Sequence, residues 1–293
     1  MTSTGSAAPR FGLIAGEGRF PFLILDVARN QGIEMVVAAI REEAHPELAS
    51  RASCFHWVGL GELSRLINIF KSEGVTRAVM AGKVKHTRIF SSIRPDWKLL
   101  QVLLALPRKN TDSLIGAVAK VLQQEGIFLE DSTLFLQPLL APLGLLTHRE
   151  PDPEEQANLS YGQTIARELA RLDIGQTVVV ADGACVAVEA MEGTDAAIRR
   201  AARLANGKRL AVVKVAKPSQ DMRFDVPIVG LSTVNVMKES GATALSVDAA
   251  RTLLFEKEEM LRQADEAGIS IVGVAPEDAG MVSVSEMSER QRS

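Results

Sequence analysis

The chain has 293 residues, about twice the length of a typical single domain, so we expect two domains of ordinary size. Apolar residues make up 46% of the chain and aromatic residues only 4%, an aliphatic bias that favours an α/β fold. The formal net charge of −3 provides no global field that would attract nucleic acid or an anionic bilayer, so we expect no nucleic-acid partner.

The cysteines and the amino terminus favour a cytoplasmic location. Cys54 and Cys185 lie in strand-like runs in different halves of the chain, which argues against a disulfide framework. Residues 1–10 lack the basic and apolar regions of a secretory signal. No apolar run reaches about 18 residues, the length that spans a bilayer. An acylated ligand would therefore have to come from a membrane surface.

The first half alternates short apolar runs with amphipathic stretches, the rhythm of a parallel sheet with right-handed crossovers. The predicted strands are residues 11–15, 34–40, 55–58, 75–81 and 127–130. The predicted helices are residues 21–30, 62–73, 97–106 and 112–125. We expect residues 10–150 to form a Rossmann-like domain with a mostly parallel sheet.

A proline-bracketed polar segment, residues 147–155, has the composition of a linker, which places the domain boundary near residue 155. We expect residues 156–275 to form a second, catalytic α/β domain, followed by a polar tail at 276–293. Its predicted helices are 154–172, 194–205 and 232–240, and its predicted strands are 177–180, 185–191, 211–215, 226–229, 243–247 and 269–274. Asp182-Gly183 indicates a hairpin, so this sheet should be mixed.

A glycine-rich turn, Gly12-Leu-Ile-Ala-Gly16-Glu-Gly18-Arg-Phe-Pro21, follows the first strand. Backbone N–H groups at such a helix start can hold phosphate or ribose oxygens, and Arg19 would assist. The dinucleotide fingerprint is incomplete, because Pro21 replaces its third glycine and no diagnostic acid follows the second strand. The two readings are a ligand contact at Gly16 and Gly18, or a plain tight turn.

Lys83 follows the fourth predicted strand, at the carboxyl edge where open α/β sheets bind ligands. A lysine there suits a phosphate as a point charge. The Walker spacing is absent, so this is no P-loop. Lys83 is either a phosphate ligand or part of a solvated basic loop.

The segment Lys214-Val-Ala-Lys217-Pro-Ser-Gln-Asp221-Met-Arg223-Phe-Asp225-Val-Pro227 concentrates cations and carboxylates between apolar strands. Phosphoryl transfer needs cations that neutralise phosphate oxygens and carboxylates that hold Mg²⁺ or orient water. The alternative is a solvated charged loop. Because proline restricts its predecessor to extended geometry, Asp225 should lie at the rim of the strand that follows.

Thr194 and Asp195 begin a predicted helix, where either is a natural N-cap. The alternative is that their oxygens face a ligand at the end of a strand. Asp131-Ser132-Thr133 is a similar and weaker signal.

Two kinds of catalytic site find no support in the sequence. The histidines, His45, His56, His86 and His148, show neither HxH nor HExxH spacing, which argues against a zinc site. No G-x-S-x-G elbow is present, and neither cysteine has a basic neighbour in sequence, so covalent catalysis is not expected.

Taken in order, several blocks resemble the LpxI family of UDP-2,3-diacylglucosamine pyrophosphatases. The resemblance runs from about residue 11 to 275 and rests on the segments 12–21, 77–83, 94–97, 172–177, 189–195 and 214–227. The last two blocks are long enough to be specific.

The resemblance implies a Mg²⁺-dependent hydrolysis of the pyrophosphate to UMP and 2,3-diacylglucosamine 1-phosphate (lipid X), a step of lipid A biosynthesis. It also implies two α/β domains joined by a linker, a lipid product held between them, and a homodimer with transient contact to the inner-membrane surface. The catalytic aspartate carried over is Asp225. From residue chemistry we add Asp221, Asp195 and Asp225 itself as metal ligands, and the substrate-binding residues Gly16, Gly18, Lys83, Thr194, Lys214, Lys217 and Arg223.

Two rival functions stay open at this point. A nucleotide-cofactor oxidoreductase would use the glycine-rich turn and would respond to NAD(P)H. A non-catalytic nucleotide-sugar or lipid carrier would bind the same ligands tightly without cleaving a phosphate bond.

Overall fold

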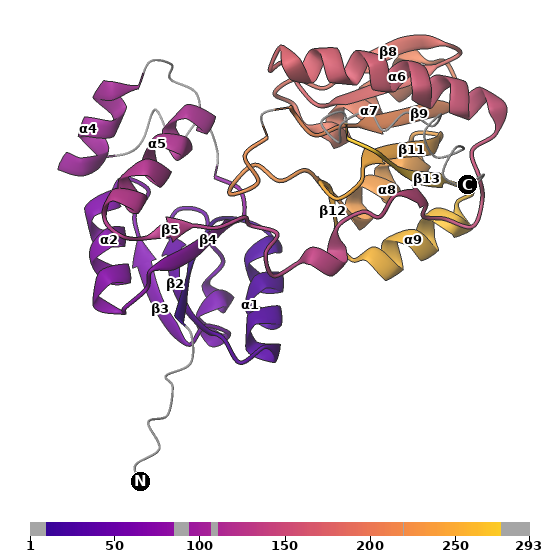
Figure 1. The fold of residues 1–293 in the computed structure, drawn as a ribbon. Helices are drawn as coiled ribbons and strands as arrows, with labels where there is room; N and C mark the ends of the chain where they lie inside the picture. Colours follow the sequence, from indigo (N-terminus) through magenta and orange to yellow (C-terminus); the bar gives the residue numbers. More distant parts are fainter. Residues whose placement is uncertain (1–9, 85–93, 107–110, 219, 277–293) are drawn as a thin grey trace, which may run out of the picture. The chain divides into compact units, whose positions relative to one another are not determined.

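The computed structural model describes residues 10–84, 94–106, 111–218 and 220–276, and its internal contacts divide the chain into two compact units (Figure 1). The first unit comprises Met1–Gln137 together with Asp221–Asp225. The second comprises Pro138–Gln220 and Val226–Ser293. Each unit is built on its own sheet.

The first unit contains a five-stranded sheet in which every neighbouring pair is parallel. Its strand order is β3 (Cys54–Val58), β2 (Glu34–Ile40), β1 (Arg10–Ala15), β4 (Arg77–Ala81) and β5 (Phe128–Leu129). The order reverses between β1 and β4, which makes these neighbours the switch point of a Rossmann-like sheet. The predicted parallel α/β class is confirmed for this unit.

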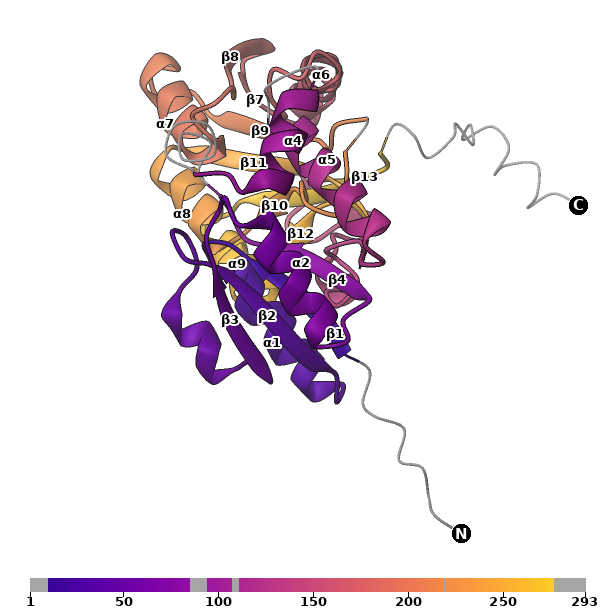
Figure 2. The same ribbon diagram turned by 90° about the vertical axis from the view of Figure 1, so that its left-hand side faces the viewer.

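Helices cover both faces of the first sheet, because the apolar residues on each face of a parallel sheet need to be buried. They are α1 (Phe20–Asn30), α2 (Leu63–Ser72), α4 (Trp97–Ala105) and α5 (Thr111–Gln124), with a 3₁₀ turn, η1, at Pro46–Ser50. In Figure 1, α1 and α2 lie on opposite sides of the sheet, and Figure 2 shows the same helices beside β1–β3 from another side. The fully buried Phe70 of α2 packs in the core with Val36 and Ile14 of the sheet.

Asp96 joins two of these helices. One oxygen of its carboxylate accepts the N–H of Leu99 at 3.0 Å and caps α4, and the other accepts the N–H of Ser64 at 2.6 Å in the first turn of α2. A capping carboxylate satisfies N–H groups that have no partner inside the helix. The Arg94-Pro-Asp-Trp97 segment, one of those that carry the family resemblance, therefore has a structural role.

The second unit contains a six-stranded mixed sheet, as the sequence predicts. Its order is β6 (Gly144–Leu145), β13 (Ser270–Val274), β11 (Ala242–Asp248), β9 (Leu210–Lys214), β7 (Thr177–Ala181) and β8 (Ala184–Val188). The three central strands β13, β11 and β9 are parallel, and the other three pair antiparallel to their neighbours. The hairpin between β7 and β8 turns at Asp182 and Gly183, whose φ values of 53° and 70° are those of a type I′ turn.

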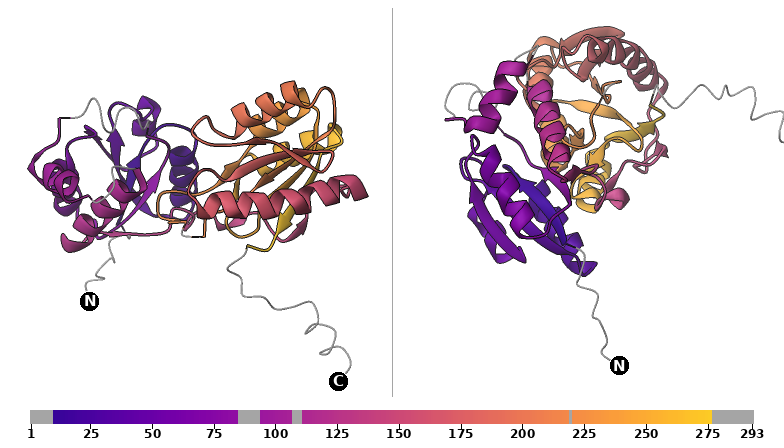
Figure 3. Two further views of the ribbon diagram at one scale, coloured as in Figure 1. Left: turned by 90° about the horizontal axis from the view of Figure 1, so that it is seen from above. Right: turned by 60° about the vertical axis from the view of Figure 1, so that its left-hand side comes forward.

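Two helical layers enclose this sheet. The long helix α6 (Pro153–Arg171) packs on one face, and α7 (Thr194–Leu204), α8 (Leu231–Glu239) and α9 (Lys257–Glu266) pack on the other, an arrangement visible in the left panel of Figure 3. Gly162 lets α6 approach closely, since a Cβ there would lie 2.7 Å from a methyl carbon of Val213. A small parallel pair, β10 (Ile228–Val229) and β12 (Leu253–Leu254), adjoins this unit's core.

The first unit ends at Gln137, earlier than the boundary near residue 155 that composition favours. After the short 3₁₀ turn η2 (Gln137–Leu139), the chain joins the second unit because β6 pairs with β13. The expected linker is also tied down: buried Thr147 accepts the N–H of Ile271 at 2.9 Å, and Arg149 forms a bidentate pair with Glu155. Proline-rich polar composition does not distinguish this packed entry segment from a free linker.

Sequence patterns also missed α9, β6 and β12. α9 carries little apolar surface, and β6 and β12 span two residues each. Over the described residues, no helix is both long enough and apolar enough to cross a bilayer. Of the predicted polar tail, residues 276–293, all but the first residue lie outside the described residues.

Candidate functional site

The segment Asp221–Asp225 packs with the first unit, although the sequence places Asp225 in the C-terminal domain. Ser132 holds it there: its N–H donates to the carbonyl of Met222 at 2.9 Å. Its hydroxyl lies 2.6 Å from the carbonyl oxygens of both Arg223 and Met80. Met80 belongs to β4, so the strongest candidate segment is anchored at the carboxyl end of a central strand of the first sheet.

Within this segment, Arg223 and Asp221 form a bidentate ion pair. Arg223 Nε and Nη2 donate to the two carboxylate oxygens of Asp221 at 2.8 and 2.6 Å. The hydrogen bonds from Arg223 lower the pKa of Asp221 below its ordinary value. Both carboxylate oxygens of Asp221 therefore accept hydrogen bonds from the guanidinium of Arg223. This pairing fixes the plane and direction of the guanidinium.

Asp225 closes the turn that this pair begins. Its N–H donates to the carbonyl of Asp221 at 2.9 Å, and the residue is half-buried. Pro227 and the start of β10 at Ile228 follow shortly after, so Asp225 precedes the strand as predicted.

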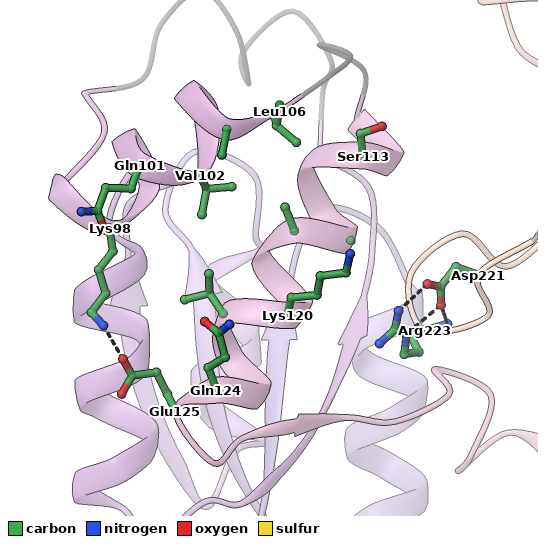
Figure 4. Close-up of a pocket in the computed structure, with 14 residues that line it drawn as sticks. Lys98, Gln101, Val102, Leu106, Ser113, Lys120, Gln124, Glu125, Asp221 and Arg223 are labelled. Carbon is green, nitrogen blue, oxygen red and sulfur yellow. Dashed lines mark hydrogen bonds and ion pairs between the residues drawn. The ribbon is translucent and has the colours of Figure 1, made fainter.

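A cavity of about 780 Å³ opens in the first unit between α4 and α5 (Figure 4). Its lining includes the apolar side chains of Val102 and Leu106 and the charged side chains of Lys98, Lys120 and Glu125, of which Lys98 and Glu125 form an ion pair. Arg223, held by Asp221, lines one side of the same cavity. A volume in this range and a largely apolar lining with a few charged groups are the features of a small-molecule site.

The loops after β1 and β4 meet at the switch point of the first sheet. Gly16 N–H donates to the carbonyl of Ala81 at 2.8 Å, and Glu17 and Lys83 exchange backbone hydrogen bonds of 2.8 and 2.9 Å. A Cβ on Gly16 would lie 2.6 Å from the carbonyl oxygen of Lys83, so glycine is needed for this close approach. The Gly16 N–H, which the sequence suggested as a ligand contact, therefore donates to a backbone carbonyl at the end of β4.

Gly18 and Lys83 keep the placement that the sequence assigned to them. Gly18 has a φ of 103° in the turn that leads into α1, a conformation that favours glycine. Lys83 lies two residues past β4 with an exposed side chain. Their ligand-binding roles stay predictions.

The second unit has a buried polar cluster at the carboxyl end of β9. Lys214, the last residue of that strand, donates to the hydroxyl of Thr194 at 2.9 Å, and that hydroxyl lies 3.1 Å from Glu189 Oε1 and 3.2 Å from the hydroxyl of Thr177. Lys214 and Glu189 are only 7% and 8% exposed. Among the described residues, Glu189 Oε2 has no hydrogen-bond partner, which is a feature of sites that a ligand or water completes.

The capping role predicted for Thr194 or Asp195 is wrong. Gly193, with a φ of 88°, occupies the N-cap of α7, and glycine has no side chain that could accept a helix N–H. Thr194 turns instead toward Lys214, and one Asp195 oxygen accepts the hydroxyl of Thr233 at 3.2 Å. The positive φ at this position favours glycine over most other residues.

The remaining predicted residues are divided between the units. Lys217 pairs with Asp173 at 2.7 Å in the second unit. Of the predicted metal ligands, Asp221 and Asp225 belong to the first unit and Asp195 to the second. In the part of the chain that the structure describes, the side chains that gather within reach of one ion are Cys54, His56 and Glu73, not these aspartates.

Sequence reasoning missed Glu189 and Thr177 and underrated Ser132. Glu189 and Thr177 stand at the ends of β8 and β7, where strand-end polar residues signal a site only once the strand order is known. Ser132 had a signal in Asp131-Ser132-Thr133. That motif leaves local capping and ligand contact open, and the Asp131 carboxylate accepts the N–H and hydroxyl of Thr133 at 2.7 Å each.

The fold and the candidate site define a class: a protein of two α/β units, one Rossmann-like and one with a mixed sheet, with cation- and carboxylate-bearing segments at strand ends. The family model described as the LpxI N-terminal domain matches residues 10–139, and the LpxI C-terminal domain model matches residues 142–272. The chain therefore belongs to the LpxI family.

A curated relative from Caulobacter vibrioides, named UDP-2,3-diacylglucosamine pyrophosphatase LpxI, is 33% identical over 279 residues. The match covers 92% of this chain and 99% of the relative. The described family resemblance is thus confirmed over nearly the whole chain.

Solved structures give weaker likenesses. Phosphoribosylglycinamide synthetase from Anaerococcus prevotii is 14% identical, with a TM-score of 0.26 over 59% of this chain and 31% of its own. N5-carboxyaminoimidazole ribonucleotide synthetase from Thermotoga maritima is 15% identical, with a TM-score of 0.24 over 63% of this chain and 42% of its own. This chain thus spans under half the length of these solved chains, and the family assignment rests on the sequence matches.

Proposed function

We propose that this protein hydrolyses the pyrophosphate bond of UDP-2,3-diacylglucosamine, giving UMP and 2,3-diacylglucosamine 1-phosphate in lipid A biosynthesis. The near full-length match to a relative named for acting on this compound supports the proposal. The structural observation that carries it is the anchoring of Asp221–Asp225 at the end of β4, with Arg223 on the cavity.

In the proposed reaction, water attacks the β-phosphorus of the substrate. The new bond joins the water oxygen to phosphorus, the bond to the bridging oxygen breaks, and UMP leaves with that oxygen. Asp225 accepts the proton of the attacking water. Arg223, preset by Asp221, neutralises charge on phosphoryl oxygens, and Lys83 adds a second cation.

Magnesium is proposed as the cofactor, and the chain's own residues fit it in part. Mg²⁺ prefers carboxylate oxygens and spreads charge away from transferring phosphoryl groups when bound. Asp225 and Asp195 have the required donor chemistry. Asp221 fits less well, because both of its oxygens already accept bonds from Arg223. We therefore assign Asp221 as the residue that positions Arg223, and Asp225 stays a metal-binding candidate of the first unit.

The cavity between α4 and α5 suits the lipid part of this substrate. Its apolar walls would bury acyl CH₂ groups at roughly 0.8 kcal/mol each. Lys98, Lys120 and Arg223 line it together with Glu125 and Asp221, so the lining carries a small excess of positive charge. A purely apolar ligand would not use these charged groups, so the lining favours an acylated phosphate.

Lys214, Thr194 and Lys217 of the second unit are proposed as further substrate contacts. Lys214 is buried beside a carboxylate whose second oxygen has no partner among the described residues. That arrangement can exchange hydrogen bonds with a ligand that brings both donors and acceptors, such as a nucleotide. The family resemblance alone supports a homodimer, which sedimentation of the purified protein would test.

Transient membrane contact is proposed through α4. Trp97 and Leu104 on this helix are 70% and 79% exposed, although both are large apolar side chains. The same helix forms a wall of the cavity, so a lipid would enter close to the surface that touches the bilayer. Cosedimentation with anionic vesicles, compared between the wild type and the Trp97→Ala variant, would test this contact.

The deciding experiment incubates the purified protein with UDP-2,3-diacylglucosamine and Mg²⁺ and follows UMP and lipid X by mass spectrometry. The expected result is stoichiometric formation of both products. Tight substrate binding without UMP would favour the carrier, and a fluorescence change with NAD(P)H would favour the oxidoreductase. Folded protein that releases no UMP would refute the proposed function.

A further inference from the structure

Three side chains with different donor atoms converge at one end of the first sheet. Cys54 and His56 lie two residues apart on β3, so their side chains leave the same face of the strand. Glu73 follows α2, the helix that covers this face. Cys54 Sγ lies 3.1 Å from His56 Nε2 and 3.4 Å from Glu73 Oε1, and the latter two atoms are 3.2 Å apart.

These separations are close to, and somewhat shorter than, the edges of a tetrahedral coordination shell. With Zn–S near 2.3 Å and Zn–N or Zn–O near 2.0–2.1 Å, two ligand atoms of a tetrahedral ion lie about 3.3–3.6 Å apart. The three observed distances are shorter than these edges, by about 0.5 Å for sulfur to nitrogen and about 0.2 Å or less for the other two, so small side-chain rotations would admit an ion. An ion above the plane of the three atoms would bind them all without movement of the backbone.

The surroundings balance the charge of such an ion. Glu73 directs Oε1 toward the sulfur and the imidazole, while its Oε2 lies 3.4 Å from Arg10. Arg10 is also paired with Glu34 at 2.8 Å, so its charge is already compensated. A thiolate and a carboxylate would then face a divalent cation with little excess charge.

The donor set also selects among metals. Sulfur and imidazole nitrogen are ligands for zinc and related transition metals, whereas Mg²⁺ takes oxygen. The three side chains are only partly buried and β3 is an edge strand, so water can reach a fourth coordination position.

We propose that Cys54, His56 and Glu73 form a three-residue site for Zn²⁺ or a similar thiophilic divalent cation, with water as the fourth ligand. Its position links the edge strand β3 to the end of α2. The site is separate from the residues assigned to hydrolysis. Metal binding there is therefore expected to raise the stability of the protein rather than its turnover. Sequence analysis missed it because Cys-x-His is not a standard zinc spacing, and Glu73 lies 17 residues after His56.

Cobalt substitution gives a direct test on the full-length protein. Metal-free wild type is titrated with Co²⁺, and a thiolate-to-cobalt charge-transfer band with intense visible d–d bands is expected at one equivalent. The Cys54→Ser variant should lose the charge-transfer band, and His56→Gln should weaken binding at least tenfold. Cys185→Ser is the matched control, because Cys185 is a half-buried free thiol on a strand of the other unit.

Thermal unfolding provides a second measurement. Excess Zn²⁺ should raise the melting temperature of the wild type and of Cys185→Ser, but not of His56→Gln, since a ligand that binds only the folded state stabilises it. Circular dichroism verifies that each variant is folded. A charge-transfer band retained by Cys54→Ser, or the absence of any such band in the wild type, would overturn the proposal. Hydrolysis is measured separately, so failure of one proposal leaves the other testable.

Discussion

The hydroxyl of Ser132 lies 2.6 Å from the carbonyl oxygen of Arg223, a residue 91 positions later in the chain. The same hydroxyl is 2.6 Å from the carbonyl of Met80, and the Ser132 side chain is completely buried. One short side chain thus joins the candidate catalytic segment to a central strand of the first sheet. The hydroxyl has a single proton, which the two carbonyls share. Removing the hydroxyl should therefore lower the stability of the protein and shift the position of Arg223.

Replacing Ser132 by alanine should therefore lower kcat/KM about tenfold or more and cost about 1–3 kcal/mol of stability, because two partly buried carbonyls lose a donor and nearby groups shift. Steady-state kinetics and chemical denaturation measure the two effects. Ser72→Ala is the control, since its hydroxyl donates only to Ile69 one turn earlier in the same helix. Wild-type kcat/KM in Ser132→Ala would contradict the anchoring role.

Asp225→Ala should lower turnover by roughly 10²-fold or more while the fold and substrate binding stay intact, if its carboxylate acts as a base or metal ligand. Turnover and melting temperature are measured on one preparation. Asp26→Ala is a matched control, because that carboxylate pairs with Arg51 on the surface. A stable Asp225→Ala protein with nearly full activity would defeat the assignment.

Removal of divalent cations by EDTA should abolish turnover, and Mg²⁺ should restore it, because charge develops on the transferring phosphoryl oxygens. The assay is repeated with Cys54→Ser, which separates a magnesium effect from removal of a thiophilic ion. Restoration by Mg²⁺ in both proteins is expected. Undiminished turnover in excess chelator would exclude the metal requirement.

The fragments 1–137 and 138–293, purified separately, should each be inactive. The first lacks Asp221–Asp225, and the second lacks the β4 and Ser132 partners on which that segment packs. UMP release is measured for each fragment alone, with the intact chain as the reference. Full activity in either fragment would show that the anchoring is dispensable.

Glu155→Gln should destabilise the protein at neutral pH by about 1–3 kcal/mol, because Arg149 loses its charged partner. Burial alone would raise the pKa of Glu155, but hydrogen bonds from Arg149 and from the N–H of Asp152 hold it below its ordinary 4.5. A lowered folded pKa stabilises above the unfolded pKa, and this stabilisation is lost as pH falls through the folded value.

The stability curves of wild type and Glu155→Gln should therefore converge when the pH falls well below 4.5. Denaturation at a series of pH values measures this convergence. Glu258→Gln, an exposed acid in the first turn of α9, should leave the curve nearly unchanged. A difference between wild type and Glu155→Gln that stays constant down to low pH would contradict the ionic origin.

Local patterns in the sequence determined most of the secondary structure. The apolar run at Glu34–Ile40 matches β2 from end to end, and Asp182-Gly183 forms the expected hairpin turn. Periodicity and turn chemistry act over a few neighbouring residues, so a single sequence contains this information. The LpxI resemblance, based on contiguous segments, was equally accessible.

Only the tertiary structure decided which distant groups meet. Asp221–Asp225 pairs with the first unit through Ser132, Thr194 faces Lys214 rather than capping α7, and Cys54 meets Glu73. Each partnership joins side chains whose separation along the chain gives no periodic signal. Their proximity follows from strand order and helix packing, which bring remote segments together once the sheets have formed. The sequence by itself therefore determined the elements and the family, whereas the packing of those elements determined the site.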